Sequence, residues 1–98
     1  MKRKLLESGR IIIPRKYADK LGIKKYEEVE IIMEYGEICI SKFNRKTFLR
    51  KPYLGIIRKP NSNLMVQIPK EYMRLINLNE NSLVELILKE NKIIIKKI

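Results

Sequence analysis

The 98-residue sequence contains no histidine and only one cysteine, Cys39. Without histidine the chain lacks the side chain best suited to proton transfer near neutral pH, and also the commonest transition-metal ligand. A single cysteine can form neither an intrachain disulfide nor a cysteine-rich zinc site, and between isoleucines in a strand it is typical of packing. We therefore expect a protein that is not an enzyme, with no catalytic residue, metal, cofactor or small-molecule substrate.

Long apolar runs are also missing. The longest, such as residues 11–14 and 93–95, are far shorter than the roughly 20 residues that a membrane-spanning helix needs. The basic start of the chain has the charge of a signal peptide, but its apolar stretch ends at Leu6, before Glu7. These features predict a cytoplasmic protein with no membrane partner.

Acidic residues are the minority charge, with 11 Asp and Glu against 22 Lys and Arg, which gives a net charge of +11. Such a positive field attracts polyanions over about 10 Å at 0.1 M salt. The charge therefore favours nucleic acid as the partner, with a solvated lysine-rich surface as the alternative. Within residues 1–43, most basic residues precede Tyr26 and most acidic residues follow it, so the positive charge gathers toward one end.

The sequence contains an internal repeat at an offset of 55 residues, and the same offset holds without gaps along most of the chain. A fixed offset over this length indicates two copies of one structural unit. The identical pairs include Ile13-Pro14 with Ile68-Pro69, Tyr17 with Tyr72, Val29-Glu30 with Val84-Glu85, Ile38 with Ile93 and Ile40 with Ile95.

Each repeat contains the signals of one short helix. Pro14 and Pro69 fit the start of a helix, where their missing amide hydrogen would have had no partner. Gly22 and Asn77 follow the apolar stripe of each helix, and both residue types readily adopt the left-handed conformation that ends a helix. The tyrosines of these stripes, at 17 and 72, are expected in the core rather than in contact with nucleic acid.

Strand signals surround each helix. Alternating apolar runs separated by a turn predict a β-hairpin after the helix, and extended segments precede it. The hairpins are expected at 29–40 and 84–95, and the earlier strands at 2–6, 10–13, 53–59 and 65–68. The unit is therefore strand, loop, strand, short helix and hairpin.

The chain divides into a first repeat at 1–43, a basic connector at 44–52 and a second repeat at 53–98. One unit alone buries too little apolar surface for stability, so two units must share a core. We expect the two repeats of one chain to fold together as a self-contained pseudo-dimer. The alternative is a homodimer in which two chains exchange repeats.

The order of Gly9-Arg10, three β-branched residues, Pro14 and a helix closed by Leu21-Gly22-Ile23 resembles the AbrB/SpoVT-like swapped-hairpin DNA-binding family. The second repeat shows the likeness in Gly55 to Lys59 and in Val66 to Glu71. The resemblance covers nearly the whole chain, twice. It implies a mainly β fold with short helices, an AbrB-like β-barrel formed by two tandem β-β-α-β-β repeats that interlock their hairpins.

The resemblance also implies binding of double-stranded DNA by basic residues of the first strand, the following loop and the helix. Carried over by position, these residues are Arg3, Lys4, Arg10, Arg58, Lys59 and Arg74. Arg15 and Lys70 join them as helix residues within reach of DNA, although a solvated helix face accounts equally well for the helix-borne cations.

The sequence departs from the family pattern at several positions. Leu64-Met65 replaces the Gly-Arg pair in the second repeat, so one of two equivalent DNA contacts is expected to be missing. Ala18-Asp19 stands where the family often has two arginines. Tyr26 and Asn81 stand where a glycine often precedes the third strand.

These features together predict a sequence-specific or shape-selective DNA-binding transcription regulator associated with the nucleoid. The alternative is a MazE-like antitoxin that binds DNA and a partner toxin. Such antitoxins usually carry a toxin-wrapping tail after the domain, whereas this sequence ends at Ile98 in the last expected strand. A third possibility is a barrel that acts as a recognition or assembly module without DNA, which a net charge of +11 disfavours.

Overall fold

The structure, a computed structural model, describes residues 1–44 and 55–98. The first repeat contains β1 (Lys2–Lys4), a 3-10 turn (Glu7–Gly9), β2 (Arg10–Ile12), α1 (Arg15–Leu21), β3 (Val29–Glu34) and β4 (Glu37–Lys42). The second contains β5 (Ile56–Arg58), β6 (Met65–Gln67), α3 (Lys70–Leu75), β7 (Leu83–Lys89) and β8 (Lys92–Lys97). Apart from Asn44, the basic connector predicted at 44–52 lies outside the described residues.

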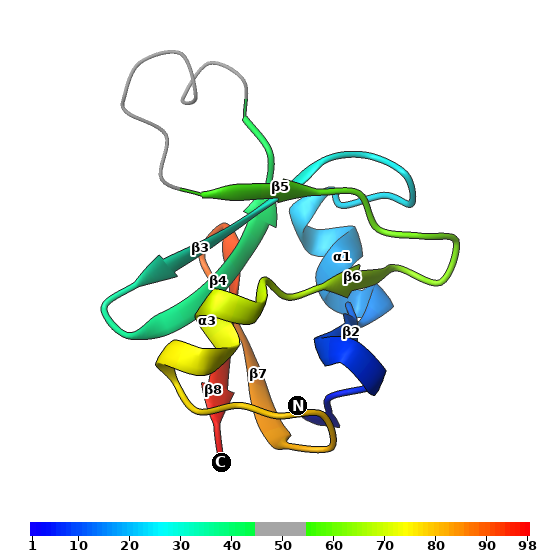
Figure 1. The fold of residues 1–98 in the computed structure, drawn as a ribbon. Coiled ribbons are helices and arrows are strands. Elements are labelled where there is room, and N and C mark those ends of the chain that lie inside the picture. The colour runs from blue at the N-terminus through cyan, green and yellow to red at the C-terminus, as the bar shows by residue number, and fades with distance from the viewer. Residues whose placement is uncertain (45–54) are drawn as a thin grey trace.

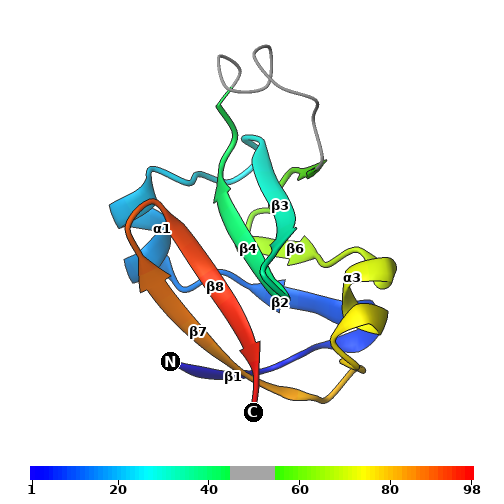
Figure 2. The same cartoon turned by 90° about the vertical axis from the view of Figure 1, so that its left-hand side faces the viewer.

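The strands of the two repeats are interleaved in one six-stranded antiparallel sheet, in the order β1-β7-β8-β4-β3-β5. The first strand of each repeat pairs with the hairpin of the other repeat, and the two hairpins meet at β4 and β8. β2 and β6 form a separate two-stranded ribbon (Figure 1), and Figure 2 shows this ribbon between α1 and α3. The predicted fold class is confirmed: a mainly β fold with short helices, made of two interlocked β-β-α-β-β repeats.

The strands do not close into the barrel that the resemblance implied. In the part of the chain that the structure describes, β1 and β5 are the two edge strands of an open sheet, and each is only three residues long. After β1 the Leu5 amide still donates to the Ser82 carbonyl at 2.9 Å, and the chain then turns away into the ribbon. Among the described strands, the ribbon and the sheet are therefore joined by side-chain packing instead of a continuous hydrogen-bond ladder.

The core lies between the inner face of the sheet and the inner face of the ribbon. Every second residue of a strand points to the same face. The inward residues, each at most 2 % exposed, are Ile11, Ile13, Val29, Ile31, Ile38, Ile40, Val66, Ile68, Val84, Leu86, Ile93 and Ile95. Tyr72 is buried and Tyr17 packs against this cluster, so the expected core role of both tyrosines is confirmed.

Left-handed backbone recurs at equivalent positions of the two repeats. Gly22 and Asn77 both have positive φ, at 73° and 56°, and the predicted helix endings are confirmed. Tyr26 and Asn81 also have positive φ, at 64° and 71°, which explains why a glycine would suit this position. The repeat is therefore reproduced in backbone conformation even where the side chains differ.

The two hairpins carry opposite charges on the outer face of the sheet. Lys92 Nζ lies 3.7 Å from Glu34 Oε2, and Lys96 Nζ lies 3.3 Å from Glu37 Oε2. Partly exposed ion pairs of this kind contribute at most about 1 kcal/mol each. They nevertheless match an acidic hairpin to a basic one, whereas two copies of the same hairpin would bring like charges together. None of the described helices is long and apolar enough to cross a membrane.

Candidate nucleic-acid interface

The ribbon presents four side chains on its outer surface. Ile11 lies opposite Val66 and both point into the core, so the residues on either side of them point outward. Cross-strand register places Arg10 opposite Gln67, and Ile12 opposite Met65. Arg10 is exposed and Ile12 is 42 % exposed, whereas Met65 and Gln67 are half-buried.

A groove flanks the ribbon on each side, between the helix of one repeat and the loop between the first two strands of the other. The first groove, of about 310 Å³, is lined by Ser8, Gly9, Lys70, Met73, Arg74, Asn77, Leu78, Asn79 and Glu80. The second, of about 430 Å³, is lined by Arg15, Asp19, Ile23, Lys24, Lys25, Glu27, Ser62 and Leu64. Most lining residues of one groove are equivalent to those of the other at the 55-residue offset, so the grooves are a pseudo-twofold pair.

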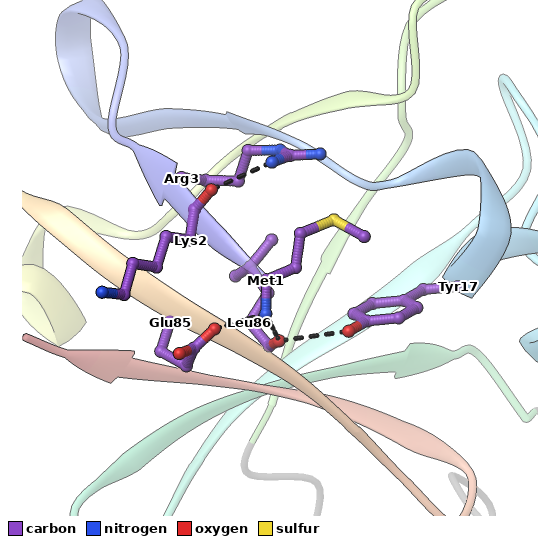
Figure 3. Close-up of polar contacts among 6 residues, drawn as sticks. All are labelled: Met1, Lys2, Arg3, Tyr17, Glu85 and Leu86. Carbon is purple, nitrogen blue, oxygen red and sulfur yellow. Dashed lines mark hydrogen bonds and ion pairs between the residues drawn. The ribbon is translucent and has the colours of Figure 1, made fainter.

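Arg3 and Arg58 lie on the two edge strands of the sheet, at opposite edges. Arg3 is opposite Val84 and Arg58 is opposite Val29, and both valines point into the core. Residues directly across an antiparallel pair share a face, so both arginines lie on the side of the sheet that the ribbon covers. Figure 3 shows Arg3 pointing away from Glu85.

The guanidinium groups of these two arginines have the same local contact. Arg3 Nη1 donates to the carbonyl of Lys2 at 2.9 Å, and Arg58 Nη1 donates to the carbonyl of Ile57 at 3.2 Å. Each contact uses one of the five donors of a guanidinium group. The pseudo-twofold relation therefore extends to these side chains.

Lys4 and Lys59 do not share that side. Lys4 is opposite Leu83, one residue along from Arg3, and alternation turns it to the outer face of the sheet. Lys59 follows β5 and lines a separate hollow together with Tyr26 and Lys42. Six of the eight predicted DNA-binding residues are thus on the ribbon side: Arg3, Arg10, Arg15, Arg58, Lys70 and Arg74.

Among the described residues three titratable groups have a shifted pKa, those of Glu85, Cys39 and Tyr72, and none of them lies on β2 or β6. Burial raises the pKa of the Tyr72 hydroxyl on α3. The amino group of Met1 donates to the Glu85 carboxylate and to the Leu86 carbonyl (Figure 3). The hydrogen bond to the carboxylate lowers the pKa of Glu85. Tyr17 Oη donates to the same carbonyl at 3.4 Å. On the outer face of the sheet, burial raises the pKa of the Cys39 thiol.

Three residues of this surface were missed by the sequence reasoning. Gln67 stands across from Arg10 on the ribbon, and Lys24 and Lys25 line the second groove. Alternation around the buried Val66 could have shown that Gln67 points outward. The two lysines follow the helix end at Gly22, in a segment without a periodic signal.

The fold and this surface define a class of protein: a small swapped-hairpin β protein with a basic ribbon side. The family model described as "Antidote-toxin recognition MazE, bacterial antitoxin" matches residues 2–47 and again residues 57–98. The chain belongs to this family and contains its domain twice. The resemblance is confirmed for the swapped-hairpin superfamily, in which the matching family is MazE and not AbrB/SpoVT itself.

None of the curated proteins matches the sequence. Among solved structures, the chain is similar to "The solution structure of PHS018 from pyrococcus horikoshii", with a TM-score of 0.55 and 19 % identity. The likeness covers 99 % of this chain and 87 % of that one. At this level of identity it supports the fold alone.

Proposed function

We propose that the chain is a double-stranded DNA-binding transcription regulator and not an enzyme, with the ribbon side as its DNA surface. The observation that carries the proposal is the gathering of cations from both repeats around one ribbon. Arg10 projects from the ribbon, Arg15 lines one groove beside it, and Lys70 and Arg74 line the other. The opposite face of the sheet carries a mixture of acidic and basic residues instead.

The dimensions suit a duplex. The major groove of B-DNA is about 12 Å wide and admits a two-stranded β-ribbon. With the ribbon in that groove, Arg10 and Gln67 face base edges, while the cations of the flanking grooves face the two phosphate backbones. Phosphate contacts supply affinity and position, and base contacts supply specificity.

The salt dependence of DNA binding tests this proposal. Fluorescence anisotropy of a labelled duplex at several salt concentrations gives the slope of log K against log salt. Each phosphate-contacting cation contributes about 1 to that slope, so removing one arginine from each flanking groove, in Arg15→Ala combined with Arg74→Ala, should reduce it by about 2.

The matched control removes the same charge from the outer face of the sheet, in Lys89→Ala combined with Lys96→Ala. This variant should keep the original slope. An absence of binding at low salt contradicts the proposal, and so does an equal loss of slope in the two variants.

A second candidate is recognition of a partner toxin, favoured by the description of the family to which the chain belongs. Co-expression with a candidate toxin followed by size-exclusion chromatography tests it. A stoichiometric complex supports this function, and separate elution of the two proteins contradicts it for that toxin.

A further inference from the structure

The outer surface of the ribbon is not symmetric, although the backbone is. The 55-residue offset makes Arg10 equivalent to Met65, and Ile12 equivalent to Gln67. Two identical repeats would give two identical cross-strand pairs. Here Arg10 lies across from Gln67 and Ile12 lies across from Met65, so one end of the ribbon is polar and the other apolar.

The polar end continues into the first groove. Gln67 Nε2 donates to the carbonyl of Ser8, the second residue before Arg10. Ser8 in turn lines the groove that contains Lys70 and Arg74. Arginine, glutamine and two further cations therefore form one continuous hydrogen-bonding surface that draws on both repeats.

The apolar end leads into the second groove, where the charge differs. Ile12 is a large apolar side chain that is 42 % exposed, and its neighbour Met65 is half-buried. In the second groove Asp19 occupies the position equivalent to Arg74 in the first. A carboxylate at this position repels a phosphate that the arginine would attract.

We propose that the chain binds a non-palindromic duplex site in one fixed orientation, an inference that rests on the proposed DNA-binding function. The polar end reads guanine through Arg10 and adenine through Gln67, because a guanidinium group pairs with O6 and N7 of guanine and an amide pairs with N6 and N7 of adenine. The apolar end, with Ile12 and Met65, packs against thymine methyl groups. Because the two unlike repeats belong to one covalent chain, the polar end and the apolar end of the ribbon contact the same duplex site together.

Selection of binding sites from a random duplex pool is the first test. The full-length chain should enrich a site whose two halves differ, with guanine and adenine bases at the end that meets Arg10 and Gln67, and thymines at the other end. Inverting one half of the enriched site should weaken binding about tenfold, the change expected from losing one bidentate pair.

A symmetrised variant provides the converse test. Met65→Arg combined with Gln67→Ile gives both repeats the outward residues of the first repeat. Because these positions are outward on the ribbon, the core is unchanged, and circular dichroism can verify the fold. The variant should enrich a site closer to a palindrome. Inverting one half of the wild-type site should no longer weaken its binding about tenfold.

Directed cleavage measures orientation without relying on that variant. In a Cys39→Val background, two separate variants, Glu7→Cys and Ser62→Cys, each carry one iron chelate on the loop of one repeat. The two positions are equivalent in the repeats and both are exposed. Each chelate should cut the wild-type site near one end only, and the two chelates should cut at opposite ends.

The outcomes separate the two proposals. A palindromic site selected by the wild-type chain, or equal cleavage at both ends from each loop, overturns the fixed orientation and leaves DNA binding intact. Failure to enrich any duplex, together with no salt-dependent binding, overturns the DNA-binding function and the orientation with it.

Discussion

Gly9 sits where the two repeats interlock, and its replacement tests that contact quantitatively. Its backbone is left-handed, with φ of +76°, and a Cβ built on it would lie 2.2 Å from Met73 Sδ of the other repeat. Left-handed backbone costs a residue with a Cβ about 1–2 kcal/mol. Displacing the buried Met73 side chain from its rotamer adds about 0.5–1.5 kcal/mol. Gly9→Ala should therefore destabilise the protein by about 1.5–3.5 kcal/mol.

Gly36 offers a matched control. It has nearly the same φ, +77°, but nothing lies within 4 Å of an added Cβ. Gly36→Ala should thus show only the backbone cost of about 1–2 kcal/mol. In a Met73→Ala background, where the clash is absent, Gly9→Ala should fall to the same value.

Urea denaturation followed by circular dichroism gives these free energies, and thermal melts should show a drop of about 4–8 °C for each kcal/mol lost. Equal costs for Gly9→Ala and Gly36→Ala would refute the proposed contact between the repeats. The same conclusion would follow if the extra cost of Gly9→Ala persisted after Met73 was removed.

Three further predictions concern the sheet. Ile95→Ala, at the seam between the hairpins, should lower the free energy of unfolding by about 2–5 kcal/mol in the same assay, and a loss below 1 kcal/mol would contradict its place in the core. Glu37→Lys should cost up to about 1 kcal/mol and be largely reversed by adding Lys96→Glu, and simple additivity of the two changes would argue against the ion pair. Burial raises the folded-state pKa of the Cys39 thiol, so its contribution to the free energy of unfolding is complete below the unfolded-state pKa and is lost as pH rises through the folded-state pKa. Cys39→Val should therefore make the free energy of unfolding fall less steeply at alkaline pH, and an unchanged pH profile would contradict this prediction.

Features encoded by neighbouring residues could be predicted from the sequence. The repeat, the two short helices and their endings at Gly22 and Asn77 depend on turn chemistry within a few residues. The core positions follow from alternation along each strand. The shared core of the repeats follows from the small size of one unit.

Features that depend on register between distant strands could not be predicted. The pairing of Arg10 with Gln67 joins residues far apart in the chain, and no local signal fixes it. The outward turn of Lys4, next to the inward Arg3, depends on which strand β1 meets. The left-handed Leu64, with φ of 61°, has no signal in its residue type, because leucine rarely adopts this conformation.

The most direct test of the account is a chemical-shift titration of the 15N-labelled chain with duplex DNA. The account predicts that the largest changes fall on the ribbon, at Arg10 and Gln67, and on the helix residues of the flanking grooves, with smaller changes at the hairpin turns. Largest changes on the outer face of the sheet, around Glu34 and Lys92, would contradict it.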